Sequence, residues 1–281
     1  MTVITIFFAL LLQSAVLFYP LFHPQLSFAQ DESPQTESQT APQTATQIEI
    51  SRNTYVQKLD DYRAKELQFF IATEQYKQIQ TLASLENAVK ASKDVQLARI
   101  DALAAYFQVL RETMVSLKGA ELTKKSIQVN TLQDVIVELG IMRAQIDKGQ
   151  DRIALDKTST QYESRNLAYI GTAYSALSLI KVSNIQSATD QLGLLTSQVF
   201  DLLQTSSPSA VVLSEKQRSY DELSRTIADI KTVLLEVMKR LENLDQQYSF
   251  NSSTYSQIVD TLGQSFSKLR LAQSFLKEFA K

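Results

Sequence analysis

The chain has 281 residues, with 28 basic and 30 acidic side chains, one histidine and no cysteine. The absence of cysteine excludes disulfides, thiolate metal ligands and cysteine nucleophiles, and the near-neutral charge without a dense basic block argues against nucleic-acid binding. Six glycines and five prolines are too few for the turns of a β-rich fold, so the composition favours an all-α chain.

Residues 1–29 have the pattern of a secretory signal peptide. Residues 3–19 are mostly apolar. Ser27 and Ala29 are small residues at positions −3 and −1 of a cut after Ala29. No Lys or Arg precedes the apolar run, so an uncleaved membrane anchor is the alternative, since about 17 apolar residues are close to the lower limit for a span. Both interpretations predict an exported chain, which is periplasmic, cell-surface or secreted, and the anchor would tether its N-terminus to the membrane. A buried cytosolic helix is disfavoured, because an exposed apolar run is hard to keep soluble.

Residues 30–47 are rich in Gln, Ser, Thr and Pro and almost lack large apolar side chains. Such a segment cannot bury enough surface to offset its ordering entropy, so we expect a disordered linker. Residues 48–281 are then expected to form the helical body, with a possible subdivision near residue 149.

The first helix is expected over residues 47–80. An aromatic row recurs every seven residues at Tyr55, Tyr62, Phe69 and Tyr76. Further apolar residues are expected to widen the same face: Val56, Leu59, Phe70, Ile71 and Ile79. Core packing is the favoured interpretation of the aromatic row, and an exposed strip that stacks on a ligand, glycan or partner is the alternative.

A second helix is expected over residues 81–118, with an apolar stripe that weakens at Ser92 and Gln96. Residues 47–118 contain neither Gly nor Pro and could form one continuous rod. We favour a break near Thr81 to Ser84, because both of these residues can cap a new helix.

Two helical segments are expected over residues 121–148 and 150–204, with Gly119 before the first and Gly149 at its end. In the second segment the apolar register slips between Leu177 and Ile185. This slip predicts either a stutter in one long helix or a junction between two helices.

Residues 205–210 are the clearest internal loop, and Ser214-x-x-Gln217 resembles a capping box that opens the next helix. That helix carries an uninterrupted stripe of nine apolar positions at steps of three and four: Tyr220, Leu223, Ile227, Ile230, Leu234, Val237, Leu241, Leu244 and Tyr248. A turn is expected over residues 251–254, with Thr254-x-x-Gln257 as a second capping candidate. The last helix has a second apolar row at Leu271 and Phe275, which indicates either two buried sides or a contact surface.

The chain offers little for catalysis. Its only histidine, His23, lies within the predicted signal peptide, and no glycine-rich phosphate loop or calcium-binding loop is present. The carboxylate pairs Asp60-Asp61 and Asp221-Glu222 lie in charged helical runs and are best interpreted as solvated faces. The sequence therefore predicts no catalytic residue, no metal site and no cofactor.

Taken together, these features predict an elongated antiparallel bundle of five to six long helices with coiled-coil-like packing. The expected function is that of an exported, non-enzymatic structural, adaptor or partner-binding protein of the cell envelope. It would bind a protein partner or self-associate through its helices. The candidate interaction surface comprises Tyr55, Tyr62, Phe69, Tyr76, Leu271 and Phe275. One alternative is a membrane-active protein, either a pore former or an efflux-type tunnel component; another is an extracytoplasmic ligand-sensing bundle.

Overall fold

The computed structural model of this chain describes residues 41–118, 122–149, 151–205, 210–247 and 250–279. The predicted signal peptide, most of the predicted linker and Gly119 lie outside the described residues. The described residues from 42 onward belong to one compact unit.

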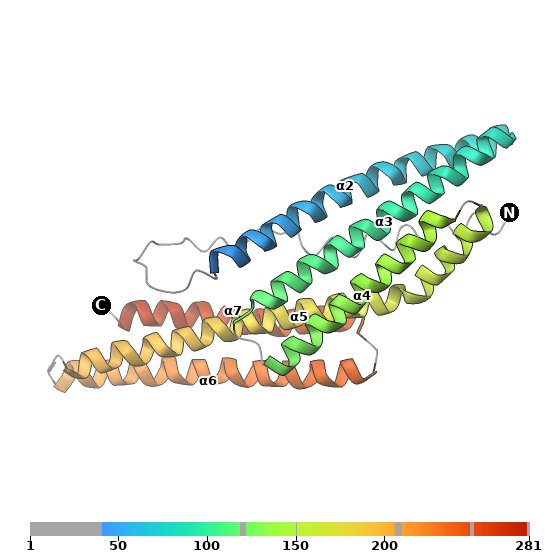
Figure 1. The fold of residues 1–281 in the computed structure, drawn as a ribbon. Helices are drawn as coiled ribbons and strands as arrows, with labels where there is room; N and C mark the ends of the chain where they lie inside the picture. Colours follow the sequence, from blue (N-terminus) through green and yellow to red (C-terminus); the bar gives the residue numbers. More distant parts are fainter. Residues whose placement is uncertain (1–40, 119–121, 150, 206–209, 248–249, 280–281) are drawn as a thin grey trace. The chain divides into compact units, whose positions relative to one another are not determined.

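Six α-helices, and no strand, make up the described part of the chain (Figure 1). In chain order they are α2 (Ala41–Ile79), α3 (Leu82–Ser116), α4 (Leu122–Lys148), α5 (Arg152–Thr205), α6 (Ala210–Gln247) and α7 (Ser252–Phe279). The prediction of an all-α bundle with five to six long helices is confirmed.

Helix α2 begins at Ala41, which is earlier than the expected start near Gln47. Residues 41–47 are therefore helical, although the sequence analysis assigned them to the linker. Pro42 falls in the first turn of the helix. A proline is compatible with that position, because backbone N–H groups in the first turn have no partner within the helix.

The chain breaks between α2 and α3 at Gln80 and Thr81, as the sequence analysis favoured. Gln80 has a left-handed backbone with φ of 52°. Thr81 is the N-cap of α3, and its side chain accepts a hydrogen bond from the Ser84 backbone N–H at 3.2 Å. The Ser84 hydroxyl lies 3.0 Å from the Thr81 backbone nitrogen and completes the capping box.

Helix α5 is a single helix of 54 residues, so the register slip between Leu177 and Ile185 is not a junction between two helices. Its N-cap is Asp151, which accepts a hydrogen bond from the Ala154 backbone N–H at 2.8 Å. All the residues from 173 to 179 are buried. The apolar stripe loses its register there because the helix is covered on every side, and small Ser and Ala residues alternate with larger ones in this segment.

Helix α6 buries the stripe that the sequence predicts. The central residues Leu223, Ile227, Ile230, Leu234, Val237 and Leu241 are all buried. Tyr220 and Leu244 are half-buried, and Tyr248 lies outside the described residues.

The two capping candidates after residue 210 are wrong. Helix α6 begins at Ala210, so Ser214 lies inside it. Helix α7 is capped by Asn251, whose Oδ1 accepts a hydrogen bond from the Thr254 backbone N–H at 3.0 Å, and Thr254 is therefore in the first turn. Asparagine is preferred over threonine at the N-cap, and in this helix Asn251 rather than Thr254 occupies that position.

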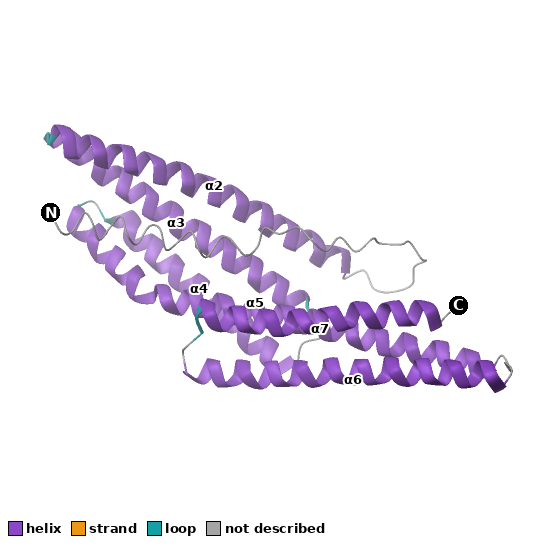
Figure 2. Ribbon diagram, turned by 180° about the vertical axis from the view of Figure 1, so that it is seen from behind, coloured by secondary structure: helices purple, strands orange, loops and turns teal. Residues whose placement is uncertain are grey.

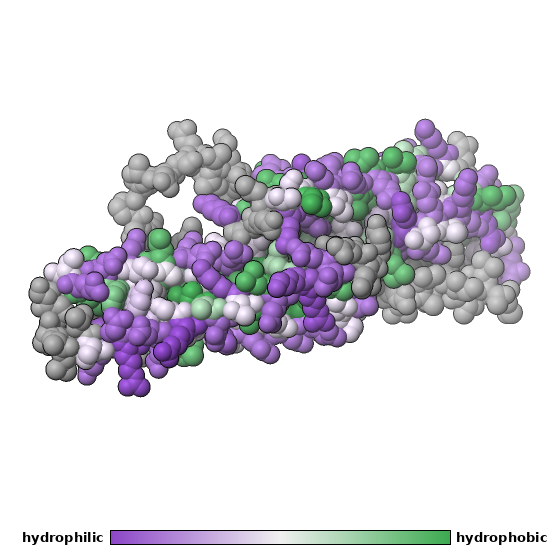
Figure 3. Space-filling view, turned by 90° about the horizontal axis from the view of Figure 1, so that it is seen from below, coloured by the Kyte–Doolittle hydropathy of each residue, from purple (hydrophilic) through white to green (hydrophobic). Residues whose placement is uncertain are grey.

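Consecutive helices from α2 to α7 run antiparallel to one another (Figures 1 and 2). Helix α5 contacts α3, α4, α6 and α7, while α3 packs on α4 and α6 packs on α7. The turn near residue 149, which the sequence analysis offered as a subdivision, joins two helices that contact each other. On the face shown in Figure 3, apolar residues occur as separate spots among hydrophilic residues.

Buried glutamines fix α5 against its neighbours. Gln96 of α3 is 7% exposed, and its Oε1 lies 3.2 Å from the hydroxyl of Thr158. Gln128 of α4 is similarly buried and accepts a hydrogen bond from Ser175 at 3.2 Å. A buried amide must find its partner, so each pair favours one register of the helices over a slipped one.

Candidate functional site

The aromatic row of α2 does not form an exposed strip. Tyr55 and Tyr62 are each 4% exposed, and Phe69 and Tyr76 are half-buried. The structure therefore places the first two residues of the candidate interaction surface in the core, as the core-packing interpretation expects.

The row joins an aromatic cluster shared by α2, α3 and α5. The ring of Tyr55 lies 5.5 Å from that of Tyr106, and Phe107 lies 6.3 Å from Tyr169. Tyr169 in turn lies 6.2 Å from Tyr162. Tilted and edge-on rings at these separations stabilise a core beyond the area that they bury.

Arg99 of α3 lies between two tyrosine rings of this cluster. Its guanidinium carbon is 5.9 Å from the ring centre of Tyr62 and 5.4 Å from that of Tyr162. Its Nε atom is buried and has no hydrogen-bond partner among the described residues. The cation is thus held by ring faces from α2 and α5, which makes Arg99 a link between three helices.

Burial raises the pKa of several tyrosines. Desolvation raises the pKa of Tyr255 to about 12, with a smaller contribution from Tyr174, whose ring stacks on it at 4.6 Å. Desolvation also raises the pKa of Tyr55, Tyr106 and Tyr169 well above the usual value for tyrosine. These hydroxyls stay protonated at neutral pH, so they are poor general bases and act in packing.

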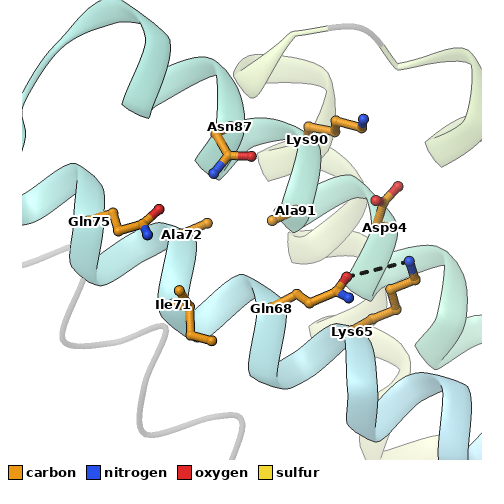
Figure 4. Close-up of a pocket in the computed structure, with 9 residues that line it drawn as sticks. All are labelled: Lys65, Gln68, Ile71, Ala72, Gln75, Asn87, Lys90, Ala91 and Asp94. Carbon is orange, nitrogen blue, oxygen red and sulfur yellow. Dashed lines mark hydrogen bonds between the residues drawn. The ribbon is translucent and has the colours of Figure 1, made fainter.

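A cleft of about 400 Å³ lies between α2 and α3 (Figure 4). Its walls carry the side chains of Lys65, Gln68, Ile71, Ala72 and Gln75 from α2 and of Asn87, Lys90, Ala91 and Asp94 from α3. Small side chains at Ala72 and Ala91 leave the space open between the helices. On the α2 wall, Lys65 donates a hydrogen bond to the Gln68 side chain at 3.5 Å.

The chemistry of this cleft is that of hydrogen bonding. Its three amides both donate and accept, its two lysines donate, and Asp94 is its single carboxylate. No nucleophile with an adjacent base lines it. Among the residues that the structure describes, no group of three or more His, Asp or Glu side chains could hold a metal ion.

The two candidate residues of α7 lie in different environments. Leu271 is 51% exposed. Phe275 packs against a small cluster formed by Leu192, Leu223, Ile227 and Ala272. Leu271 is therefore exposed whereas Phe275 is partly buried, so the second apolar row of this helix is divided between surface and core.

Helix α2 also carries exposed apolar side chains away from its aromatic row. Leu67 is 60% exposed, Ile71 47%, Phe70 44% and Val56 39%. The sequence analysis assigned Val56, Phe70, Ile71 and Ile79 to the buried face; that assignment is wrong for all four, and only Leu59 is buried. The reason is geometric, because Val56 and Phe70 each follow a row residue and lie about 100° around the helix from it.

Sequence reasoning missed Arg99 and the residues of the cleft. The weakened stripe at Ser92 and Gln96 was a signal for polar contacts on α3. It did not indicate which helix would supply the partners, because the partner of Gln96 is Thr158 of α5, which is far away in sequence.

None of the helices in the described ranges is both long and apolar enough to cross a membrane. Comparisons with protein-family models, with curated proteins and with solved structures found no match for this chain. Its function is therefore argued from its own residues and their arrangement.

Proposed function

We propose that this chain is an exported, non-enzymatic helical protein that acts at the cell envelope by binding a protein through the exposed face of α2. The observation that carries the proposal is the apolar character of that face. Four large apolar side chains between residues 56 and 71 are 39% to 60% exposed.

Exposed apolar side chains are common singly, but a group on one helix face is typical of an interaction surface. Here Leu67, Phe70 and Ile71 are neighbours at steps of three and four residues, which are adjacent positions on a helix. A partner that covers them would remove this apolar surface from water, which is favourable.

Export is supported by the sequence of residues 1–29, with its apolar run and its small residues before a cut after Ala29. A non-enzymatic role is supported by the chemistry of the remaining residues. After residue 29 the chain has neither His nor Cys, which are the commonest general base and a common nucleophile.

Cell fractionation tests the export part of the proposal. The full-length gene is expressed, and the protein is located by protease protection in intact cells and weighed by mass spectrometry. We expect a chain outside the cytoplasm that begins at Gln30, or an uncut chain tethered to the membrane. An uncut chain in the soluble cytosolic fraction would contradict the proposal.

A liposome assay separates partner binding from membrane activity. The protein recovered from those cells is added to dye-loaded vesicles over a range of concentrations. We expect no dye release, since partner binding needs no breach of a bilayer. Release that rises with protein concentration would instead support a pore former.

A further inference from the structure

The exposed face of α2 has the spacing of a coiled-coil seam. Seven positions alternate at steps of four and three: Val56, Asp60, Arg63, Leu67, Phe70, Glu74 and Lys77. This is the spacing of heptad positions a and d, which face a partner helix continuously. The apolar residues lie at Val56 and at the centre of the seam, and charged residues flank the centre on both sides.

The order of charges along this seam distinguishes the two directions in which a partner copy could lie. From the N-terminal end the signs run negative, positive, and then, after the apolar centre, negative, positive again. Within one chain these charges pair along the helix, with Arg63 and Asp60 at 3.3 Å and Lys77 and Glu74 at 2.6 Å. All four side chains are at least one-third exposed and can therefore face a second helix.

We infer that α2 forms an antiparallel coiled coil with α2 of a second copy of this chain, about a two-fold axis between Gln68 and Phe69. That axis sets Asp60 opposite the partner's Lys77 and Arg63 opposite the partner's Glu74. It sets Leu67 opposite the partner's Phe70. A two-fold interface of this kind uses the same surface on both subunits.

In this arrangement every seam residue from Asp60 to Lys77 faces a favourable residue of the partner. Each opposed pair joins an a position to a d position, as an antiparallel coiled coil requires. The outer pairs have opposite charge, and the central pair is apolar. A parallel pair in register would instead set like charges opposite each other at all four charged positions, which is unfavourable.

The inference rests on the proposed function, because it assumes that the exposed face of α2 binds a protein. Different experiments would refute the inference and the export part of the proposed function. Self-association is measured with purified protein and does not depend on export, whereas fractionation does not depend on the oligomeric state.

Two half-reversed variants test the register. One variant carries Asp60→Lys and Arg63→Glu, and the other carries Glu74→Lys and Lys77→Glu. Each variant keeps its ion pair along the helix with the signs exchanged, so we expect both to fold, as checked by circular dichroism. In a homodimer of either variant, every charged seam position meets a like charge.

Sedimentation equilibrium is measured for the wild-type protein, for each variant and for their equimolar mixture. We expect the wild-type protein to dimerise, and each variant alone to have a dissociation constant raised by at least about tenfold. The mixture should recover association, because every charged position in the heterodimer again meets its opposite. A monomeric wild-type protein, unaffected variants or a mixture that stays monomeric would overturn the inference.

Single cysteines give a second measurement, because the natural chain has none. In the antiparallel pair, two copies of Val56→Cys lie 25 residues apart along the helix, or about 37 Å. An oxidising reagent should therefore not join them, whereas Arg63→Cys mixed with Glu74→Cys should give a disulfide-linked dimer. Rapid linking of Val56→Cys to itself would show a parallel pair and overturn the inference.

The single substitution Leu67→Glu tests the seam even if the charge-reversed variants fail to fold. Its matched control is Leu235→Glu, since Leu235 lies on α6 and is 63% exposed. We expect Leu67→Glu to weaken dimerisation by at least about tenfold and the control to leave it unchanged. Equal effects of the two substitutions would count against the α2 seam.

Discussion

Arg99 is the residue at which three helices meet through one side chain. Its guanidinium lies near the rings of both Tyr62 and Tyr162. Its Nε is buried without a hydrogen-bond partner among the described residues, and the two ring faces attract the guanidinium charge. The sequence could not predict this contact, since heptad spacing describes one helix and not the side chains of its neighbours.

Replacing Arg99 by Ala should lower the free energy of unfolding by about 1–2 kcal/mol, since cation–π contacts and packing of the stem are both lost. Urea denaturation measures the change. Arg152→Ala is the control, because Arg152 pairs with Asp156 in an exposed position and should matter by less than about 0.5 kcal/mol. An Arg99 variant as stable as this control would show that the contacts with the two rings contribute little.

The raised pKa of Tyr255 predicts that the stability of the protein falls in alkali. Unfolded tyrosine loses its proton near pH 10, whereas the pKa of Tyr255 in the folded chain is about 12. The unfolded state therefore binds fewer protons above pH 10, and the stability contributed by this group is lost as the pH rises from about 10 to 12.

Tyr255→Phe should therefore show a smaller loss of stability than the wild-type protein over that range. Urea denaturation at a series of pH values from 9 to 12 tests this expectation. Because Tyr255→Phe keeps the ring that stacks on Tyr174, the two proteins should be similar at pH 9. The same dependence on pH in both proteins would exclude Tyr255 as a source of the alkaline loss.

At the scale of the helices, the turn between α2 and α3 combines a favourable N-cap at Thr81 with an unfavourable backbone conformation at Gln80. Thr81 and Ser84 form a capping box, while Gln80 has a φ that residues other than glycine adopt at a cost. The first feature could be predicted because capping residues act locally. The second could not, since nothing in the residue type of Gln80 indicates a positive φ.

Gln80→Gly should raise the free energy of unfolding by about 0.5–1 kcal/mol, because glycine adopts this backbone without a steric penalty. Thr81→Ala, next to it, should lower the free energy of unfolding by about 1 kcal/mol through loss of the cap. Thermal unfolding followed by circular dichroism measures both. If both substitutions changed stability in the same direction, this description of the turn would be incorrect.

The limits of sequence prediction also appear at the helix termini. The stripe of α6 was predictable residue by residue, because one face of that helix is covered and the other is not. The start of the same helix was not, since Ala210 has no capping side chain and Ser214 has the pattern of one. On α2 the row from Tyr55 to Tyr76 indicated the buried face, but its width was overestimated, and the second face became visible only in the structure.

At the scale of the whole molecule, α5 is the element that joins α3 and α4 to α6 and α7. It contacts α3 and α4 as well as α6 and α7, and its residues from 173 to 179 are all buried. This arrangement predicts that the described helices of the unit unfold together. Two independent halves would need an exposed joining segment, and in the described part of α5 the segment between the two sets of neighbours is buried.

Ile230→Ala tests this cooperativity. Ile230 of α6 is fully buried, so its truncation should cost about 2–5 kcal/mol. Hydrogen exchange should then show reduced protection in α3 and α4 as well as in α6 and α7. The control Leu235→Ala, at an exposed position of the same helix, should change stability by no more than about 0.5 kcal/mol. Loss of protection confined to α6 and α7 would show that the bundle unfolds in parts.

The claim that the exposed face of α2 binds a protein outside the cytoplasm can be measured directly in intact cells. A photo-crosslinking amino acid replaces Leu67 in one strain and Leu235 in another, since the two leucines have similar exposure, 60% and 63%. After irradiation, we predict a discrete protein adduct from position 67 in the exported fraction and none from position 235. The absence of an adduct at position 67, or equal adducts at both positions, would contradict the account.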